Sequence, residues 1–123
     1  MILGVGLDVV HVERLRHWLH VSGLLDRFFH PDEIAAVRSR GESAALSLAA
    51  RFAAKEAFGK AIGTGLRGIA LRDIRVENDE AGKPHIFLYG SALAAFARAG
   101  GRTVHLSLTH ERDNAMALAV VEG

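Results

Sequence analysis

The feature that most constrains this fold is an alanine-rich stretch at the centre of the chain, residues 43–62. Ser43 is a residue type that caps helices and Gly63 is one that ends them, so the stretch predicts a helix of about 20 residues. One stripe of this helix is apolar and almost entirely alanine: Leu46, Ala50, Ala53, Ala54, Ala57 and Ala61. Because alanine side chains are small, this stripe lets another backbone come very close.

The segments around this helix predict strands and shorter helices. Residues 1–10 read as a buried strand with two glycines, where another part of the chain can approach the backbone closely. The other expected elements are a helix, a helix beginning near Pro31, a hairpin, a short helix capped by Ser91 and a second hairpin: residues 11–19, 31–41, 69–89, 91–101 and 103–122. This order predicts one α+β domain, residues 1–123, with a mostly antiparallel sheet packed against the long central helix.

Composition narrows the classes of function. Half of the residues are hydrophobic and 24% are charged, with a net charge of +1. These values fit a folded core and argue against disorder and against a nucleic-acid-binding surface. The chain has no cysteine, which excludes disulfides, zinc-thiolate sites and thiol nucleophiles. The N-terminus lacks the pattern of a signal peptide and no apolar run is long enough to span a membrane, so we expect a cytoplasmic protein with no membrane partner.

The long helix carries four charges among its alanines: Arg51, Lys55, Glu56 and Lys60. Taken alone, such charges at i, i+4 spacing read as a solvated helix face, where each favourable pair contributes roughly 0.2–0.5 kcal/mol. Arg51 and Lys60 lie about half a turn apart in projection, so they cannot enter one pocket on one side of a single helix. The helix ends in Gly-Thr-Gly, whose glycines would let a ligand reach the backbone.

Asp8 is an isolated carboxylate in an otherwise apolar strand. A buried carboxylate is costly unless it is paired, hydrogen-bonded or bound to a metal. Glu56, on a helix packed over that strand, could supply a second oxygen, and two carboxylates with substrate phosphates commonly hold Mg²⁺. Lys60, one turn further on, would neutralise a bound phosphate. On spacing alone, an Asp8 that caps the next helix or pairs with Lys55 or Lys60 is equally compatible.

Near the C-terminus, the sequence "SLTH" ends a predicted strand. Ser107 and Thr109 share one side of that strand, so their hydroxyls could bind one phosphate group, and His110 could be a phosphate partner or a base. No nucleophile elbow or oxyanion-hole pattern accompanies Ser107, which argues against a serine nucleophile. His17 and His20 have i, i+3 spacing without a third metal ligand, so we interpret them as surface residues.

Taken together, "GVGLDVVHVERL", "RFAAKEAFGKAIGTG" and "HLSLTH" resemble the bacterial holo-[acyl-carrier-protein] synthases, the small 4′-phosphopantetheinyl transferases. The resemblance runs essentially end to end and includes the hairpin "DIRVENDEAGKPHIFL". It implies Mg²⁺-dependent transfer of the 4′-phosphopantetheine arm of coenzyme A to a serine of apo-acyl carrier protein, in fatty acid biosynthesis. Adenosine 3′,5′-bisphosphate would be the second product.

The resemblance also implies roles for individual residues. Asp8 and Glu56 are the expected Mg²⁺ ligands, and Lys60 is the expected phosphate-neutralising lysine of the catalytic group. The expected contacts to coenzyme A are Arg51, Lys55, Gly63, Thr64, Gly65, Ser107, Thr109 and His110. The expected contacts to the acidic carrier protein are Arg14, Arg16 and Arg27. Larger relatives have a third acid where this chain has Val10, so a water is expected to fill that position.

Family members that resemble this chain are homotrimers with active sites between subunits, which would explain charges on several sides of one helix. The expected mechanism is in-line attack of the carrier serine on the β-phosphate of coenzyme A, with the proton passing to Glu56 or to a metal-bound water. Two alternatives stay open. One is a Mg²⁺-dependent enzyme that cleaves a nucleotide pyrophosphate with the same residues. The other is a non-catalytic nucleotide- or RNA-binding module, although no basic stripe interleaved with aromatic residues supports it.

Overall fold

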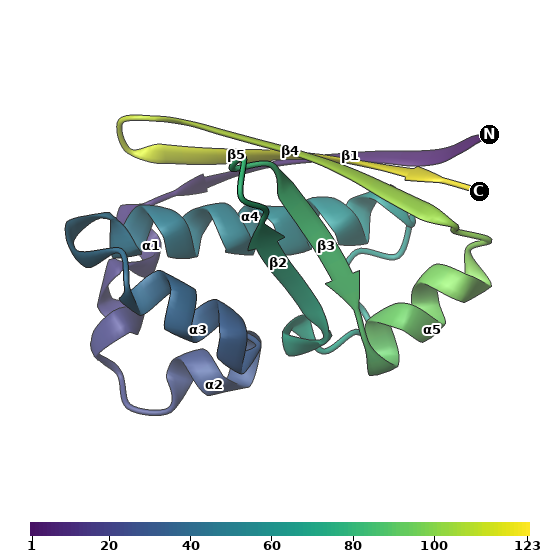
Figure 1. The fold of residues 1–123 in the computed structure, drawn as a ribbon. Helices are drawn as coiled ribbons and strands as arrows, with labels where there is room; N and C mark the ends of the chain where they lie inside the picture. Colours follow the sequence, from purple (N-terminus) through teal and green to yellow (C-terminus); the bar gives the residue numbers. More distant parts are fainter.

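A three-stranded antiparallel sheet forms one side of the molecule in the computed structural model, which describes residues 1–123 (Figure 1). Its strands are β1 (Ile2–His11), β5 (Asn114–Glu122) and β4 (Thr103–Glu111), in the order β1-β5-β4. The two termini meet at one end of this sheet, where the Gly123 N–H donates to the Met1 carbonyl oxygen at 2.9 Å. The predicted α+β class, with antiparallel strands and a long helix, is confirmed.

Helix α4 (Ala44–Ala61) lies against one face of this sheet (Figure 1). A separate two-stranded hairpin of β2 (Ile74–Asn78) and β3 (Pro84–Leu88) lies beside α4 and is not hydrogen-bonded to the larger sheet. The remaining α-helices are α1 (Glu13–Arg16), α2 (Leu24–Phe28), α3 (Pro31–Arg38) and α5 (Gly90–Arg98). None of the helices combines the length and the apolar character needed to cross a membrane.

Helix α4 approaches β1 more closely than ordinary side chains would allow. A Cβ atom added at Gly6 would collide with the carbonyl oxygen of Ala57, and one added at Gly4 with that of Ala61. The glycines of the strand therefore face the alanines of the helix, backbone against backbone. This contact confirms the close approach that the alanine stripe and the two glycines predict.

The opposite face of the three-stranded sheet is apolar and uncovered in this chain. Along β1, side chains alternate between the two faces, so Val5, Leu7 and Val9 point away from α4 and are 53–60% exposed. Leu118 on β5 lies in the same row as Leu7 and is 39% exposed. No helix covers this face, which is the upper one in Figure 1.

Some of the short helices differ from those predicted from the sequence. Residues 11–19 do not form one helix, because β1 continues through the first of them, and α1 is followed by a separate 3₁₀ turn at His17–His20. Helix α2 was not predicted at all. It follows Gly23 without a side-chain cap, and the burial of Leu25 holds it in place.

Neither predicted serine cap is made by the side chain. Ser43 stands at the N-cap of α4, but its hydroxyl makes no capping hydrogen bond. Ser91 lies inside α5, whose N-cap is Tyr89. Its hydroxyl instead donates to Oδ2 of Asp73 at 2.6 Å, which ties the start of α5 to the segment before β2. A tertiary partner therefore takes the hydroxyl that local spacing assigns to a cap.

Candidate active site

Asp8 points from β1 toward α4, where it meets Lys60. The Nζ atom of Lys60 donates to Oδ1 of Asp8 at 3.0 Å and to the carbonyl oxygen of Leu7 at 2.9 Å. The Asp8 side chain is 17% exposed and that of Lys60 is 51% exposed, so the pair opens to solvent. Asp8 therefore pairs with Lys60, which is one of the alternatives that the sequence left open. It does not cap α1, because that helix has no side-chain cap.

Glu56 lies one turn before Lys60 on α4, close to Asp8. Burial, and then the negative charge of Asp8, raise the pKa of Glu56, while Lys60 and Arg14 oppose that rise. Asp8 on β1 and Glu56 on α4 are therefore near enough to repel each other. No histidine or further acidic residue joins Asp8 and Glu56 to make a cluster of three possible metal ligands. Two carboxylates fit Mg²⁺, which commonly takes its other ligands from water and substrate phosphates.

The Gly-Thr-Gly loop turns back against the end of α4. Gly63 and Gly65 have φ angles of 88° and 63°, in the left-handed region that glycine adopts without strain. The Gly65 N–H donates to the carbonyl oxygen of Gly59 at 2.9 Å. The loop, in which Thr64 is exposed, therefore packs against the last turn of α4, which also carries Lys60.

Arg51 and His110 line a cavity of about 290 Å³ on a different flank of α4. Arg51 is only 5% exposed, and burial lowers its pKa against the opposing charge of Glu33. Its Nη1 atom donates to Oγ of Ser47 at 2.5 Å, whereas its Nε atom is buried with no hydrogen-bond partner. A guanidinium with an unused donor beside a histidine suits an anionic group. The rest of the lining comes from α4, β2, β4 and the segment before α4: Arg40, Ser43, Leu46, Ala50, Val76, Asn78 and Leu108.

Lys55 has no exposed surface, unlike the other charges of α4. Its Nζ atom donates to Oε1 of Glu33 at 2.7 Å, to the carbonyl oxygen of Leu71 at 2.9 Å and to that of Ile74. Burial lowers the pKa of Lys55 to about 8, although Glu33 opposes that change. All three donors of the ammonium group are used inside the protein. We therefore leave Lys55 out of the proposed coenzyme A contacts.

Ser107 and Thr109 lie on the face of the sheet that is turned away from α4. They line a hollow of about 260 Å³ together with the exposed Leu7. Asp8 lies on the opposite face of the same sheet, so these hydroxyls cannot reach it within one chain. His110 alternates back to the face of Asp8 and enters the cavity of Arg51. One chain thus holds the expected site residues in separate places.

The predicted carrier-binding arginines are exposed and lie near the start of the chain. Arg14 on α1 is close enough to Glu56 to lower the pKa of that carboxyl. Arg16 donates from Nε to Oε1 of Glu13 at 2.8 Å, and Arg27 lies over the ring of Phe28 on α2. The structure therefore puts Arg14 within electrostatic range of Glu56.

Comparison with known proteins settles the family. Residues 4–119 match the family model of the 4′-phosphopantetheinyl transferase superfamily. The chain belongs to this superfamily. It is 55% identical over 123 residues to the holo-[acyl-carrier-protein] synthase of Treponema denticola, with all of both chains covered. The resemblance seen in the sequence motifs is therefore confirmed.

Solved structures of similar proteins share the fold along the whole chain. The holo-[acyl-carrier-protein] synthase of Neisseria meningitidis matches with a TM-score of 0.87 and 38% identity, with all of both chains covered. A holo-(acyl-carrier-protein) synthase from Bacillus anthracis, in complex with coenzyme A (3′,5′-ADP), matches with a TM-score of 0.81 and 32% identity. That match covers 98% of this chain and 96% of the other.

Several residues that line the cavity of Arg51 were not predicted from the sequence. Arg40, Ser47 and Asn78 lie in different segments and carry no motif that joins them. Glu33 had a signal, since an acid in the third position of a helix forms a capping box, and its Oε1 atom does accept from the His30 N–H at 3.0 Å. That signal did not show that the same carboxylate would bind Lys55.

Proposed function

We propose that this chain transfers the 4′-phosphopantetheine group of coenzyme A to a serine of an apo-acyl carrier protein. One observation carries the proposal. In a chain of the 4′-phosphopantetheinyl transferase superfamily, Asp8 of β1 lies close to Glu56 and Lys60 of α4. The products are holo-acyl carrier protein and adenosine 3′,5′-bisphosphate. We place the reaction in cytoplasmic fatty acid biosynthesis and assign it to residues 1–123 as a single domain.

Mg²⁺ is the cofactor that we propose for the carboxylate pair. Asp8 and Glu56 would hold it. Burial, and then repulsion by Asp8, raise the pKa of Glu56, and a shared cation would offset that repulsion. When bound there, Mg²⁺ would offset the negative charge of the coenzyme A pyrophosphate. The half-exposed ammonium of Lys60 is available to the same phosphates.

In the proposed reaction, the carrier serine oxygen forms a bond to the β-phosphorus of coenzyme A. The bond from that phosphorus to the oxygen shared with the α-phosphate breaks, and adenosine 3′,5′-bisphosphate leaves with the electron pair. Lys60 stabilises the charge that develops on the phosphates. Glu56 takes the serine proton or orients the water that takes it.

We further propose that the enzyme is a homotrimer with each active site between two subunits. The uncovered row of Val5, Leu7 and Val9 supports an interface, since monomers rarely expose large apolar patches. Asp8 and Thr109 lie on opposite faces of the sheet within one chain. An interface would bring them together, because the carboxylates of one subunit can face β4 of its neighbour. A coenzyme A molecule would then extend from the Asp8–Glu56–Lys60 group and its Gly-Thr-Gly loop to the neighbour's cavity of Arg51 and His110.

The carrier protein is proposed to dock on the exposed arginines of α1 and α2. Arg14 leads from this surface to Glu56, so an acidic carrier bound there would present its serine at the carboxylate pair. Arg16 and Arg27 would add attraction that weakens as salt is raised.

One assay tests the proposal and its rivals. The protein is incubated with coenzyme A, Mg²⁺ and apo-acyl carrier protein, and the carrier is weighed by mass spectrometry. We expect a gain of one phosphopantetheine group, which a metal chelator prevents. Cleavage of coenzyme A without a carrier would instead support a pyrophosphate-cleaving enzyme. Binding of nucleotide with no turnover across several carriers would support a binding module and overturn the proposal.

A further inference from the structure

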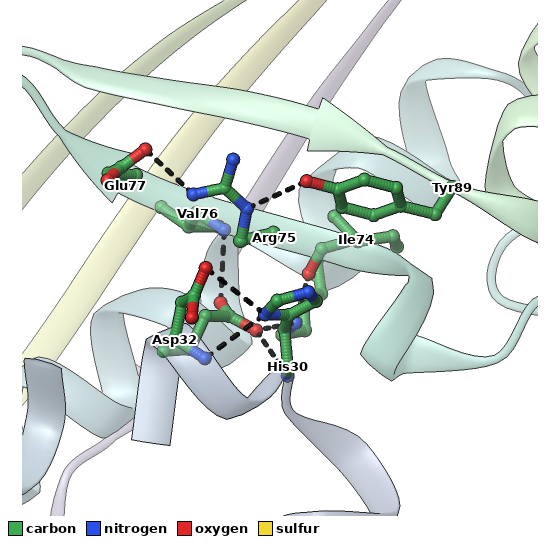
Figure 2. A network of polar contacts seen from close by, with 9 residues as sticks. His30, Asp32, Ile74, Arg75, Val76, Glu77 and Tyr89 are labelled. Atoms are coloured by element: carbon green, nitrogen blue, oxygen red, sulfur yellow. Dashed lines mark hydrogen bonds and ion pairs between the residues drawn. The ribbon is translucent and has the colours of Figure 1, made fainter. Parts of the chain in front are cut away.

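A buried ion pair between Glu33 and Lys55 joins α3, α4 and β2. Both side chains are wholly inaccessible to solvent. Besides its bond to Lys55, Glu33 accepts from the Val76 N–H through Oε2 at 3.1 Å. Lys55 donates to the carbonyl oxygen of Ile74, two residues earlier on the same strand. Figure 2 shows Ile74 and Val76 of β2 on one side of this network and His30, at the start of α3, on the other.

This network fixes the position of a hairpin that the main sheet does not hold. Strands β2 and β3 form their own sheet, so no strand pairing joins them to β1, β5 or β4. The bonds from Val76 to Glu33 and from Lys55 to Ile74 and Leu71 therefore attach β2 and the turn before it to the helices. Without them, β2 would be held mainly by its apolar side chains.

The same hairpin forms one wall of the cavity that contains Arg51. Val76 and Asn78 of β2 line that cavity opposite residues of α4. Arg51 lies one helical turn before Lys55, and the charge of Glu33 acts on it directly, since it opposes the lowering of the Arg51 pKa by burial. The ion pair thus lies behind the cavity and touches both of its walls.

Stability alone does not account for a buried ion pair. Removing two charges from water is costly, and a protein in which well-packed apolar residues of similar volume replace the pair is often equally stable. The geometry of this pair is specific: two carboxylate oxygens and one ammonium group satisfy groups on three elements at once. Such an arrangement defines distances between elements, which an apolar cluster does less strictly.

We propose that Glu33 and Lys55 are positioning residues that hold the β2 wall of the cavity at the distance from Arg51 that coenzyme A requires. They set the affinity for coenzyme A without touching the reacting atoms. This inference rests on the proposed function, because it assigns the cavity to the nucleotide end of coenzyme A. It also explains why Lys55 belongs beside the site residues of α4 although it cannot contact the substrate.

The test is the double variant Glu33→Gln/Lys55→Met, which removes both charges and leaves neither one buried without a partner. We expect KM for coenzyme A to rise about tenfold or more, with kcat within about threefold of wild type. KM for the carrier protein should not change. Calorimetry with adenosine 3′,5′-bisphosphate should show the same loss of affinity, since that ligand occupies only the nucleotide end.

Phe96→Leu is the matched control, because Phe96 is a buried residue of α5 outside the network and the cavity. It should lower the melting temperature and leave KM unchanged, since a smaller folded fraction reduces only the apparent kcat. If the double variant does not fold, the same measurements are made on Glu33→Asp, whose shorter side chain keeps the charge but changes the distance to Lys55 and Val76. An unchanged KM in a folded variant would overturn the positioning role while wild-type transfer still supports the enzyme. Absence of transfer by the wild type would overturn both.

Discussion

At the scale of single residues, the four charges of α4 have three different surroundings. Lys60 is half exposed and pairs with Asp8, whereas Lys55 is buried and pairs with Glu33. Glu56 faces Asp8, and Arg51 enters a cavity on another flank. The ion pairs that local spacing suggested within α4 are therefore not the ones that form, because these side chains meet charged groups on neighbouring elements.

The first prediction concerns Glu56. Glu56→Gln keeps the size of the side chain but removes the charge, so it should lose both the proposed metal contact and the proposed proton acceptor. We expect kcat/KM to fall by at least about 100-fold, with an unchanged circular dichroism spectrum. Glu80→Gln, at an exposed position in the β2–β3 turn, is the control and should retain full activity. Transfer at the wild-type rate by the Glu56 variant would remove this residue from the mechanism.

The second prediction concerns the contact between β1 and α4. Gly6→Ala places a methyl group against the Ala57 carbonyl oxygen, and neither backbone can move away without opening the core. We expect a loss of about 2–3 kcal/mol in the free energy of unfolding by urea. Gly82→Ala should cost only about 1 kcal/mol, because it meets nothing within 4 Å and is strained only by its φ of 87°. Equal losses at the two positions would contradict the close packing.

At the scale of elements, the turn between β2 and β3 is organised by Asp79. Its Oδ1 atom accepts from the N–H groups of Ala81 and Lys83, both at 2.9 Å, and its Oδ2 atom lies 2.9 Å from Nε2 of His85. The hydrogen bond from His85, and then that from Lys83, lower the pKa of Asp79 below its ordinary value. The turn therefore depends on a charged carboxylate.

The third prediction follows from the sign of that shift. A lowered pKa in the folded state means that ionised Asp79 stabilises the fold above its ordinary pKa of 3.8, and that this contribution is lost as the pH falls below that value. Asp79→Asn keeps the acceptor oxygen but removes the charge. Its melting temperature should lie below that of the wild type at pH 7, and the difference should shrink as the pH falls below about 4. A difference independent of pH would show that the charge contributes nothing.

At the scale of the whole molecule, the uncovered face of the three-stranded sheet is the surface that we propose as the subunit interface. The fourth prediction is that Leu7→Glu, on the uncovered face where Leu7 is 60% exposed, gives a folded monomer. A charge there costs little in a single chain but is buried in an interface. Gel filtration with light scattering should show an about threefold smaller mass than the wild type, with loss of transfer. A wild-type mass would place the interface elsewhere.

The fifth prediction tests whether two chains share each site. Glu56→Gln and His110→Ala should each be inactive alone. In trimers mixed at random in equal amounts, about a quarter of the sites would combine an intact Glu56 with an intact His110 from the neighbour. Co-expression of the two variants should therefore restore about a quarter of the wild-type activity. No recovery would mean that both residues act within one chain.

The sequence by itself determined the long helix and the strands, and it singled out Asp8, because these depend on local signals. Alanine spacing and flanking glycines specify α4, and strand-type runs on either side of a turn specify the C-terminal hairpin. An apolar run specifies β1, although the prediction that this strand is buried holds for only one of its faces in the single chain. An isolated charge singles out Asp8. Only the tertiary structure decided that Lys55 is buried while Lys60 is open, that Ser91 binds Asp73, and that Arg51 and His110 share a cavity. The physical reason is that burial and partner choice come from residues distant in sequence. Spacing along one helix cannot tell which element will pack against it.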